Sequence, residues 1–353
     1  MLQTILLFAG AAATGYLFDL LHIPMGWMLG PMVTGIAWAA RSGKSAPLHP
    51  AYMACGQAVF GLSTGAGFPL ATLLMAATHG VPLLLAVVLT GGLALLNGHF
   101  LIKWAGLDRA TGYMGSLPGA AATMVAMADE LGADAVVVTV LQYWRVIMVM
   151  FLVPLAVHSL FPATGDGAAT AGAAATGLHS VHWLINLAVL AVVGVLGAMG
   201  GRKVKLPSPT FLGPFLLMLA VSWTLPFQWL MPGPLFTAGM LLVGISIGVR
   251  FDMSTVKRLG KAALIETLLV LVLISICLGV GYSFHLVTGI NTMTAVLGST
   301  PGAMDVMVAS AYEMGGDPGM VLAMQMTRWF IILMAGPWIT VKLVRTVAAK
   351  RAA

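Results

Sequence analysis

The chain has 353 residues, of which 59% are hydrophobic and only 8% are charged, and its mean hydropathy is +0.98. Soluble domains carry about 25% charged residues, so this composition excludes a soluble globular protein and indicates a polytopic membrane protein. The formal net charge of +6 is carried by Lys and Arg residues between apolar stretches and gives no reason to expect nucleic acid as a partner.

Apolar stretches long enough to cross a hydrocarbon layer of about 30 Å follow one another along the chain. In the first half, the sequence predicts spans at 2–20, 25–40, 50–67, 81–102 and 134–158. In the second half, it predicts spans at 182–200, 207–225, 233–250, 262–285 and 317–341. Two shorter segments, 110–131 and 291–314, each contain a Pro-Gly pair.

The two halves are copies of one another. Residues 116–154 align without a gap to residues 299–337, at a constant offset of 183, and 15 of the 39 aligned residues are identical. An internal repeat of this kind indicates duplicated structural units. We therefore expect a first membrane repeat at 1–160, a flexible Ala/Gly linker at 161–181, and a second membrane repeat at 182–353.

The placement of the Lys and Arg residues predicts the topology. If each short segment enters the membrane and turns back, each repeat has five spans and the two repeats have inverted orientations. Fifteen of the 17 Lys and Arg residues then lie on one side, which is predicted to be cytoplasmic, and both termini lie there too. The expected fold is thus all-α, with about ten spans and two re-entrant helices.

The Pro-Gly pairs mark the predicted start of a short helix near the middle of the membrane. The first-turn amides of such a helix are unpaired and attract an anion. Paired broken helices in inverted repeats are a recurrent design of transporters. The predicted substrate ligands in and beside these turns are Ser116, Pro118, Gly119, Ser299, Thr300, Pro301 and Gly302.

Two arginines are predicted inside spans. Arg145 and Arg328 each follow the start of their span by about 16 Å of helix, and Gln142 and Gln325 precede them by three residues on the same helical face. A charge at that depth is costly and points to function. Each Gln-Arg pair could hold a substrate anion, or each arginine could pair with a carboxylate of the re-entrant segment and fix its conformation.

Five carboxylates accompany these segments. Asp134 and Asp317 precede spans and are expected to cap them, whereas Glu130 and Glu313 could pair with arginine or bind a proton or cation. Asp305 has Ala122 as its repeat equivalent and falls in the first turn of the second re-entrant helix. All five are candidates for coupling to H⁺ or Na⁺, and helix capping is the alternative.

No motif for an enzyme is found. The eight histidines are scattered, and the sequence has no P-loop, nucleophile elbow or dinucleotide-binding glycine pattern. The two cysteines, Cys55 and Cys277, are expected to be buried in apolar stretches rather than to bind metal. We expect no catalytic residue, no metal and no cofactor.

The doubled Pro-Gly-Ala … Glu-x-Gly-x-Asp … Gln-x-x-Arg … Pro stretch, with a doubled Leu-Gly-Pro upstream, resembles the AbrB-type family of bacterial membrane proteins. Members of that family are labelled ammonia monooxygenases or regulators. The architecture is similar to that of elevator-type secondary transporters, so we expect transport of a small organic anion or zwitterion, such as a carboxylate or an amino acid, by alternating access and as a homodimer. A membrane oxidoreductase and a membrane-embedded regulatory protein are the alternatives.

Overall fold

The computed structural model of the chain describes residues 2–23, 25–42, 48–68, 74, 78–117, 133–160, 179–180, 182–206, 208–225, 227–250, 259–328 and 331. Most of these residues are helical, which confirms the all-α prediction at the level of fold class. Within these ranges the only strands are two residues long: β1 (His179–Ser180) pairs in parallel with β2 (Phe227–Gln228).

The helices of the first repeat are α1 (Leu2–Leu20), α2 (Gly26–Ser42), α3 (Pro50–Ala66), α5 (Gly80–Phe100), the π-helical turn η1 (Leu101–Ala105), α6 (Arg109–Ser116) and α8 (Ala135–Leu160). Those of the second are α9 (Trp183–Lys203), α10 (Pro209–Thr224), α11 (Gly233–Gly248), α13 (Gly260–Thr288), α14 (Thr292–Ser299) and α15 (Met304–Glu313). Their bounds agree with the predicted spans to within a few residues. The linker, apart from residues 179–180, lies outside the described residues, and so do residues 329–330 and 332–341 of the predicted span 317–341.

Five helices in the described part of the chain are long and apolar enough to cross a membrane, where the sequence predicted about ten spans. They are the helical stretches Gln3–Leu20, Gly80–Ala105, Ala135–Leu160, Trp183–Lys203 and Gly260–Thr288. The helices α2, α3, α10 and α11 have 16 or 17 residues. At 1.5 Å per residue they are about 24–26 Å long, which is shorter than a typical span.

The sequence repeat is also a repeat of structure. The helices α2, α3 and α6 begin 183 residues before α10, α11 and α14, respectively. Even unusual backbone conformations recur at this offset: His22 and Met25 have positive φ angles, and so do their equivalents Lys205 and Ser208. Non-glycine residues rarely adopt such angles, so their recurrence shows that the turns before α2 and α10 are the same turn.

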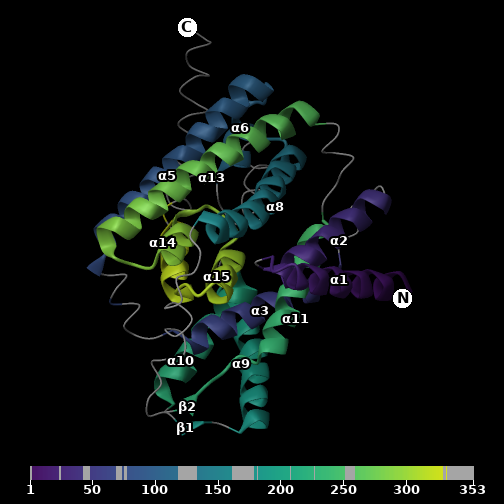
Figure 1. The fold of residues 1–353 in the computed structure, drawn as a ribbon, viewed down its shortest axis with the longest axis vertical. Helices are drawn as coiled ribbons and strands as arrows, with labels where there is room; N and C mark the ends of the chain where they lie inside the picture. Colours follow the sequence, from purple (N-terminus) through teal and green to yellow (C-terminus); the bar gives the residue numbers. More distant parts are fainter. Residues whose placement is uncertain are drawn as a thin grey trace. The chain divides into compact units, whose positions relative to one another are not determined.

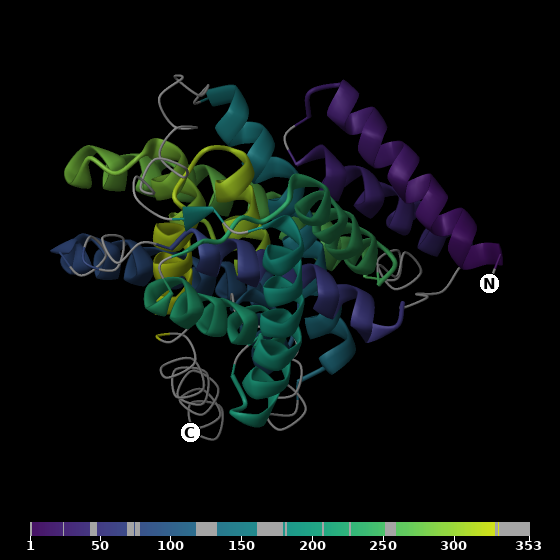
Figure 2. The ribbon, with the colours of Figure 1, turned by 90° about the horizontal axis from the view of Figure 1, so that it is seen from below.

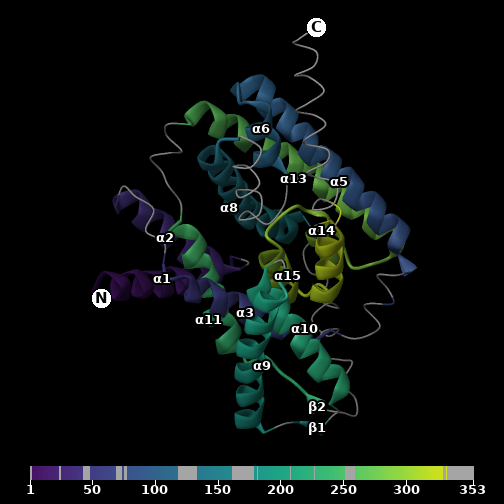
Figure 3. The same cartoon turned by 180° about the vertical axis from the view of Figure 1, so that it is seen from behind.

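The described chain divides into two compact units, each built from both repeats. Unit 1 comprises residues 1–75, 154–253 and 305–320, and unit 2 comprises residues 76–153, 254–304 and 321–353. In unit 1, α1 packs on α2 and α9 packs on α10 (Figures 2 and 3). In unit 2, α5 and α13 lie side by side, and α14 packs on α13 (Figure 1).

The two repeats exchange helices within unit 1, because α2 packs on α11 while α3 packs on α10. Glycines set these contacts: a Cβ at Gly61 would meet the backbone oxygen of Phe211, and a Cβ at Gly244 would meet that of Met28. The second contact is the first one with each residue replaced by its repeat equivalent. Reciprocal contacts of this kind are typical of two units related by a two-fold axis.

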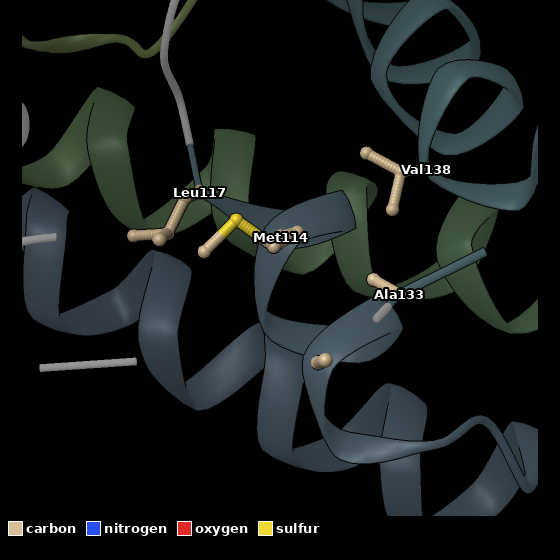
Figure 4. Close-up of a cluster of buried hydrophobic side chains, with 5 residues drawn as sticks. Met114, Leu117, Ala133 and Val138 are labelled. Carbon is tan, nitrogen blue, oxygen red and sulfur yellow. The ribbon is translucent and has the colours of Figure 1, made fainter. Parts of the chain in front are cut away.

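Small apolar clusters hold the short helix α6 in unit 2. Met114 and Leu117 at its end are buried with Ala133, which precedes α8, and with Val138 in the first turn of α8 (Figure 4). Asp108 accepts a hydrogen bond from the backbone N–H of Thr111 and caps the N-terminus of α6. The end of α6 at Leu117 is therefore buried.

Candidate functional site

The short helices α6 and α14 end at equivalent residues, Ser116 and Ser299. The backbone of the next residue is extended in both cases, at Leu117 and at Thr300, so each helix stops abruptly. In the second repeat a new helix, α15, begins at Met304. Helix ends leave carbonyl groups without intrahelical partners, and here these ends are buried.

A glutamine satisfies these carbonyls in each repeat. The side-chain amide of Gln142 donates to the carbonyl oxygens of Met114 at 2.8 Å and Leu117 at 2.9 Å. At the equivalent positions, Gln325 donates to Leu297 and Thr300, both at 3.0 Å. The two buried amides thus cap two broken helices in the same way.

An arginine completes each cap. Arg145 donates to the carbonyl oxygens of Gly115 at 3.3 Å, Ser116 at 2.5 Å and Leu117 at 3.2 Å, and to Gln142 Oε1 at 2.5 Å. Its side chain is only 3% exposed. The sequence left open whether this arginine pairs with a carboxylate of the re-entrant segment. Glu130 lies outside the described residues, and among the described residues the hydrogen bonds of Arg145 go to backbone and amide oxygens.

Arg328 makes a smaller set of contacts. It donates to the carbonyl oxygen of Ser299 at 3.2 Å and to the side-chain oxygen of Gln325. It is also 3% exposed, and its charge interacts with that of Arg145. Unit 2 therefore buries two guanidinium groups of like charge.

Glu266 on α13 was missed by the sequence analysis. Its side chain is fully buried, its charge interacts with that of Arg145, and neither of its carboxylate oxygens has a hydrogen-bond partner among the described residues. The signal was present in the sequence: an acidic residue inside an apolar span points to function as strongly as an arginine does.

Asp305 and Glu313 belong to unit 1. Asp305 lies in the first turn of α15 and accepts a hydrogen bond of 3.0 Å from the amide of Gln57, whose oxygen accepts one from Thr210. Glu313 accepts a hydrogen bond of 3.1 Å from the backbone N–H of Met25. Sequence reasoning found both acids but neither Gln57, which donates to Asp305, nor Thr210, which donates to Gln57, because these two residues carry no charge and belong to no motif.

Asp134 and Asp317 act as helix caps, as the sequence predicted. Asp134 accepts from the backbone N–H groups of Val136 and Val137, and Asp317 accepts from those of Gly319 and Met320. Of four further candidates, one is placed by a hydrogen bond and three are not described. Thr300 donates its hydroxyl to a backbone carbonyl in unit 2, whereas Pro118, Gly119 and Glu130 lie outside the described residues.

The two cysteines differ in burial. Cys277 is buried on α13, as predicted, but Cys55 is exposed on α3, so the expectation that it would be buried was wrong. The helix α3 turns its first residues outward and buries mainly its second half. No group of three or more His, Cys, Asp or Glu side chains in the described part of the chain is arranged to hold a metal ion.

Comparisons with known proteins give a consistent result. Residues 27–344 match the model of the family described as "Transition state regulatory protein AbrB". A protein of Escherichia coli (strain K12) named "Putative regulator AbrB" is 30% identical over 341 residues, which cover 95% of this chain and 94% of that protein. An uncharacterized protein of Bacillus subtilis (strain 168), YhjN, is 24% identical over 358 residues, with coverage of 94% and 91%. No solved structure matches.

Proposed function

This chain belongs to the AbrB family, and we propose that it is a secondary active transporter of a small organic anion or zwitterion, of the carboxylate or amino acid class. The observation that carries the proposal is a charge imbalance. The buried charged side chains described in unit 2 are two arginines, Arg145 and Arg328, and one acid, Glu266. Because a buried charge without a counter-charge is costly, an anionic ligand is the expected compensation.

The repeated, broken helices support the same function. Transporters of many folds place their sites where interrupted helices from two repeats expose backbone polar groups. Here the ends of α6 and α14 are interrupted at equivalent residues, each beside a buried Gln-Arg pair.

In the proposed protein the repeats have inverted orientations in the inner membrane of a bacterium, with both termini in the cytoplasm. Alternating access is coupled to H⁺ or Na⁺ through the carboxylates predicted for coupling, of which Asp305 is buried in unit 1, and the protein works as a homodimer.

The regulatory name of the E. coli relative is compatible with this proposal. A transporter that changes the concentration of a small anion in the cell would alter gene expression indirectly. A direct regulator would bind a partner and would have no need for a flux of substrate. Measured transport therefore separates the two functions.

Ligand binding is the first test. The purified protein is heated with acetate, succinate, L-alanine or L-glutamate, and its apparent melting temperature is compared with that of the protein alone. A ligand that binds only the folded state stabilises it by about 2.7 kcal/mol at a hundredfold excess over its Kd. We expect at least one of these carboxylates to raise the melting temperature, while choline, a cation of similar size, does not. If all four carboxylates leave it unchanged, the proposed substrate class is wrong.

A further inference from the structure

The two Gln-Arg pairs are equivalent in sequence but differ in their surroundings. The guanidinium of Arg145 makes four hydrogen bonds, three of them to carbonyl oxygens, whereas that of Arg328 makes two among the described residues. A guanidinium has five N–H donors. Arg145 is therefore nearly saturated by the protein, and Arg328 keeps more of its donors for another group.

The two arginines also differ in the charged groups around them. The buried charge of Glu266 interacts with that of Arg145 and offsets it in part, although no hydrogen bond joins the two side chains. The repeat equivalent of Glu266 is Leu83 in the first repeat, so Arg328 has no acid at the position that corresponds to Glu266. The neighbour of Arg328 on α13 is instead the buried thiol of Cys277. Arg328 is thus a buried cation without a described counter-ion in unit 2.

The equivalent serines Ser116 and Ser299, whose carbonyl oxygens accept from Arg145 and Arg328, also differ in the hydrogen bonding of their hydroxyl groups. In the first repeat, the hydroxyl of Ser116 donates to the carbonyl oxygen of Tyr113 at 3.1 Å. In the second repeat, the hydroxyl of Thr300 donates to the equivalent carbonyl, that of Val296. Ser299 is 3% exposed, and its hydroxyl has no partner among the described residues. A buried hydroxyl without a partner is costly and is available to a ligand.

These observations converge on one place. The carbonyl oxygen of Ser299 accepts a hydrogen bond from Arg328, so the unpartnered hydroxyl belongs to the residue that the under-compensated arginine contacts. We infer that the carboxylate of the transported anion binds to Arg328 and Ser299, whereas Arg145 with Glu266 fixes the end of α6 and does not contact substrate. This inference rests on the proposed function and deepens it. A single carboxylate supplies one negative charge and acceptors for both groups, so a monocarboxylate or amino acid is favoured over a dicarboxylate.

The variants Arg328→Gln and Ser299→Ala test the binding side. The purified full-length protein is titrated with acetate, succinate, L-alanine and L-glutamate by calorimetry. Arg328→Gln should weaken carboxylate binding about a hundredfold and Ser299→Ala about tenfold, because hydrogen bonds to a charged group are lost. The matched control is the double variant Arg145→Gln/Glu266→Gln, which removes a charge pair and should bind within about threefold of the wild type. Equal losses in Arg328→Gln and in the double variant would overturn the inference.

A second measurement does not depend on the ligand. Without any carboxylate, Arg328→Gln should leave the melting temperature unchanged or raise it, because it removes an uncompensated buried charge. Arg145→Gln should lower it, because Glu266 loses its counter-charge. If both single variants lower the melting temperature equally, the proposed asymmetry is wrong, even where the wild type binds a carboxylate. If the asymmetry is seen but no carboxylate binds, the asymmetry stands, and both the proposed substrate class and the assignment of a carboxylate to Arg328 fail.

Discussion

Replacing Arg145 by Gln is expected to lower the free energy of unfolding by about 3–5 kcal/mol, which is typical of breaking one side of a buried ion pair. The change leaves Glu266 buried without its positive neighbour and removes donors from the carbonyl oxygens of Ser116 and Leu117. Chemical unfolding of the purified protein in detergent, followed by tryptophan fluorescence, measures this loss.

The second substitution in the pair provides the control. Adding Glu266→Gln to Arg145→Gln should restore most of the lost stability, since no charge is then left alone. Lys103→Gln, on the exposed surface of η1, should have little effect. A double variant that is no more stable than Arg145→Gln would mean that Arg145 acts through its carbonyl contacts alone and that Glu266 is not its electrostatic partner.

The glycines at the helix crossings of unit 1 are expected to be almost as sensitive. Gly61→Ala would place a Cβ against the backbone oxygen of Phe211, and Gly244→Ala would place one against that of Met28. Neither backbone can move without separating two packed helices, so each change should cost about 1–3 kcal/mol. The two losses should also be similar, because the two contacts are related by the repeat.

A glycine in open space is the matched control for these variants. A Cβ at Gly91, in the middle of α5, would meet nothing within 4 Å. Gly91→Ala should therefore stabilise the protein slightly, by about 0.4–1 kcal/mol, because alanine restricts the unfolded chain. Thermal unfolding of the three variants in the same detergent compares them directly. Equal effects at all three positions would show that helix propensity, rather than close packing, determines the response.

The helix bounds could be predicted from sequence because two independent signals agree on them. Apolar stretches end at Pro, Gly or charged residues, and the repeat offset gives each boundary twice. The abrupt ends of α6 and α14, at Ser116 and Ser299, follow from the Pro-Gly pairs that come after them. The caps at Asp134 and Asp317 follow from the ordinary preference of acids for helix starts.

The partners of the site residues could not be predicted in this way. The hydrogen bonds of Arg145 and Arg328 go to carbonyl oxygens, which every residue has and which leave no trace in the sequence. The exchange of helices between repeats in unit 1 is likewise set by three-dimensional packing and not by periodicity. Glu266 is different, because its charge lies inside an apolar span of the sequence. Its repeat equivalent is the apolar Leu83, so the repeat does not mark this position.

Uptake by proteoliposomes is the most direct test of transport. Wild-type protein, Arg328→Gln and the double variant Arg145→Gln/Glu266→Gln are reconstituted at equal density, and uptake of radiolabelled acetate, succinate, L-alanine and L-glutamate is measured with an inward H⁺ or Na⁺ gradient. We predict gradient-driven uptake of at least one carboxylate by the wild type and by the double variant, and none by Arg328→Gln. Binding of a carboxylate to the wild type without any uptake in these vesicles would contradict the transporter and favour a membrane-embedded regulator that senses the same ligand.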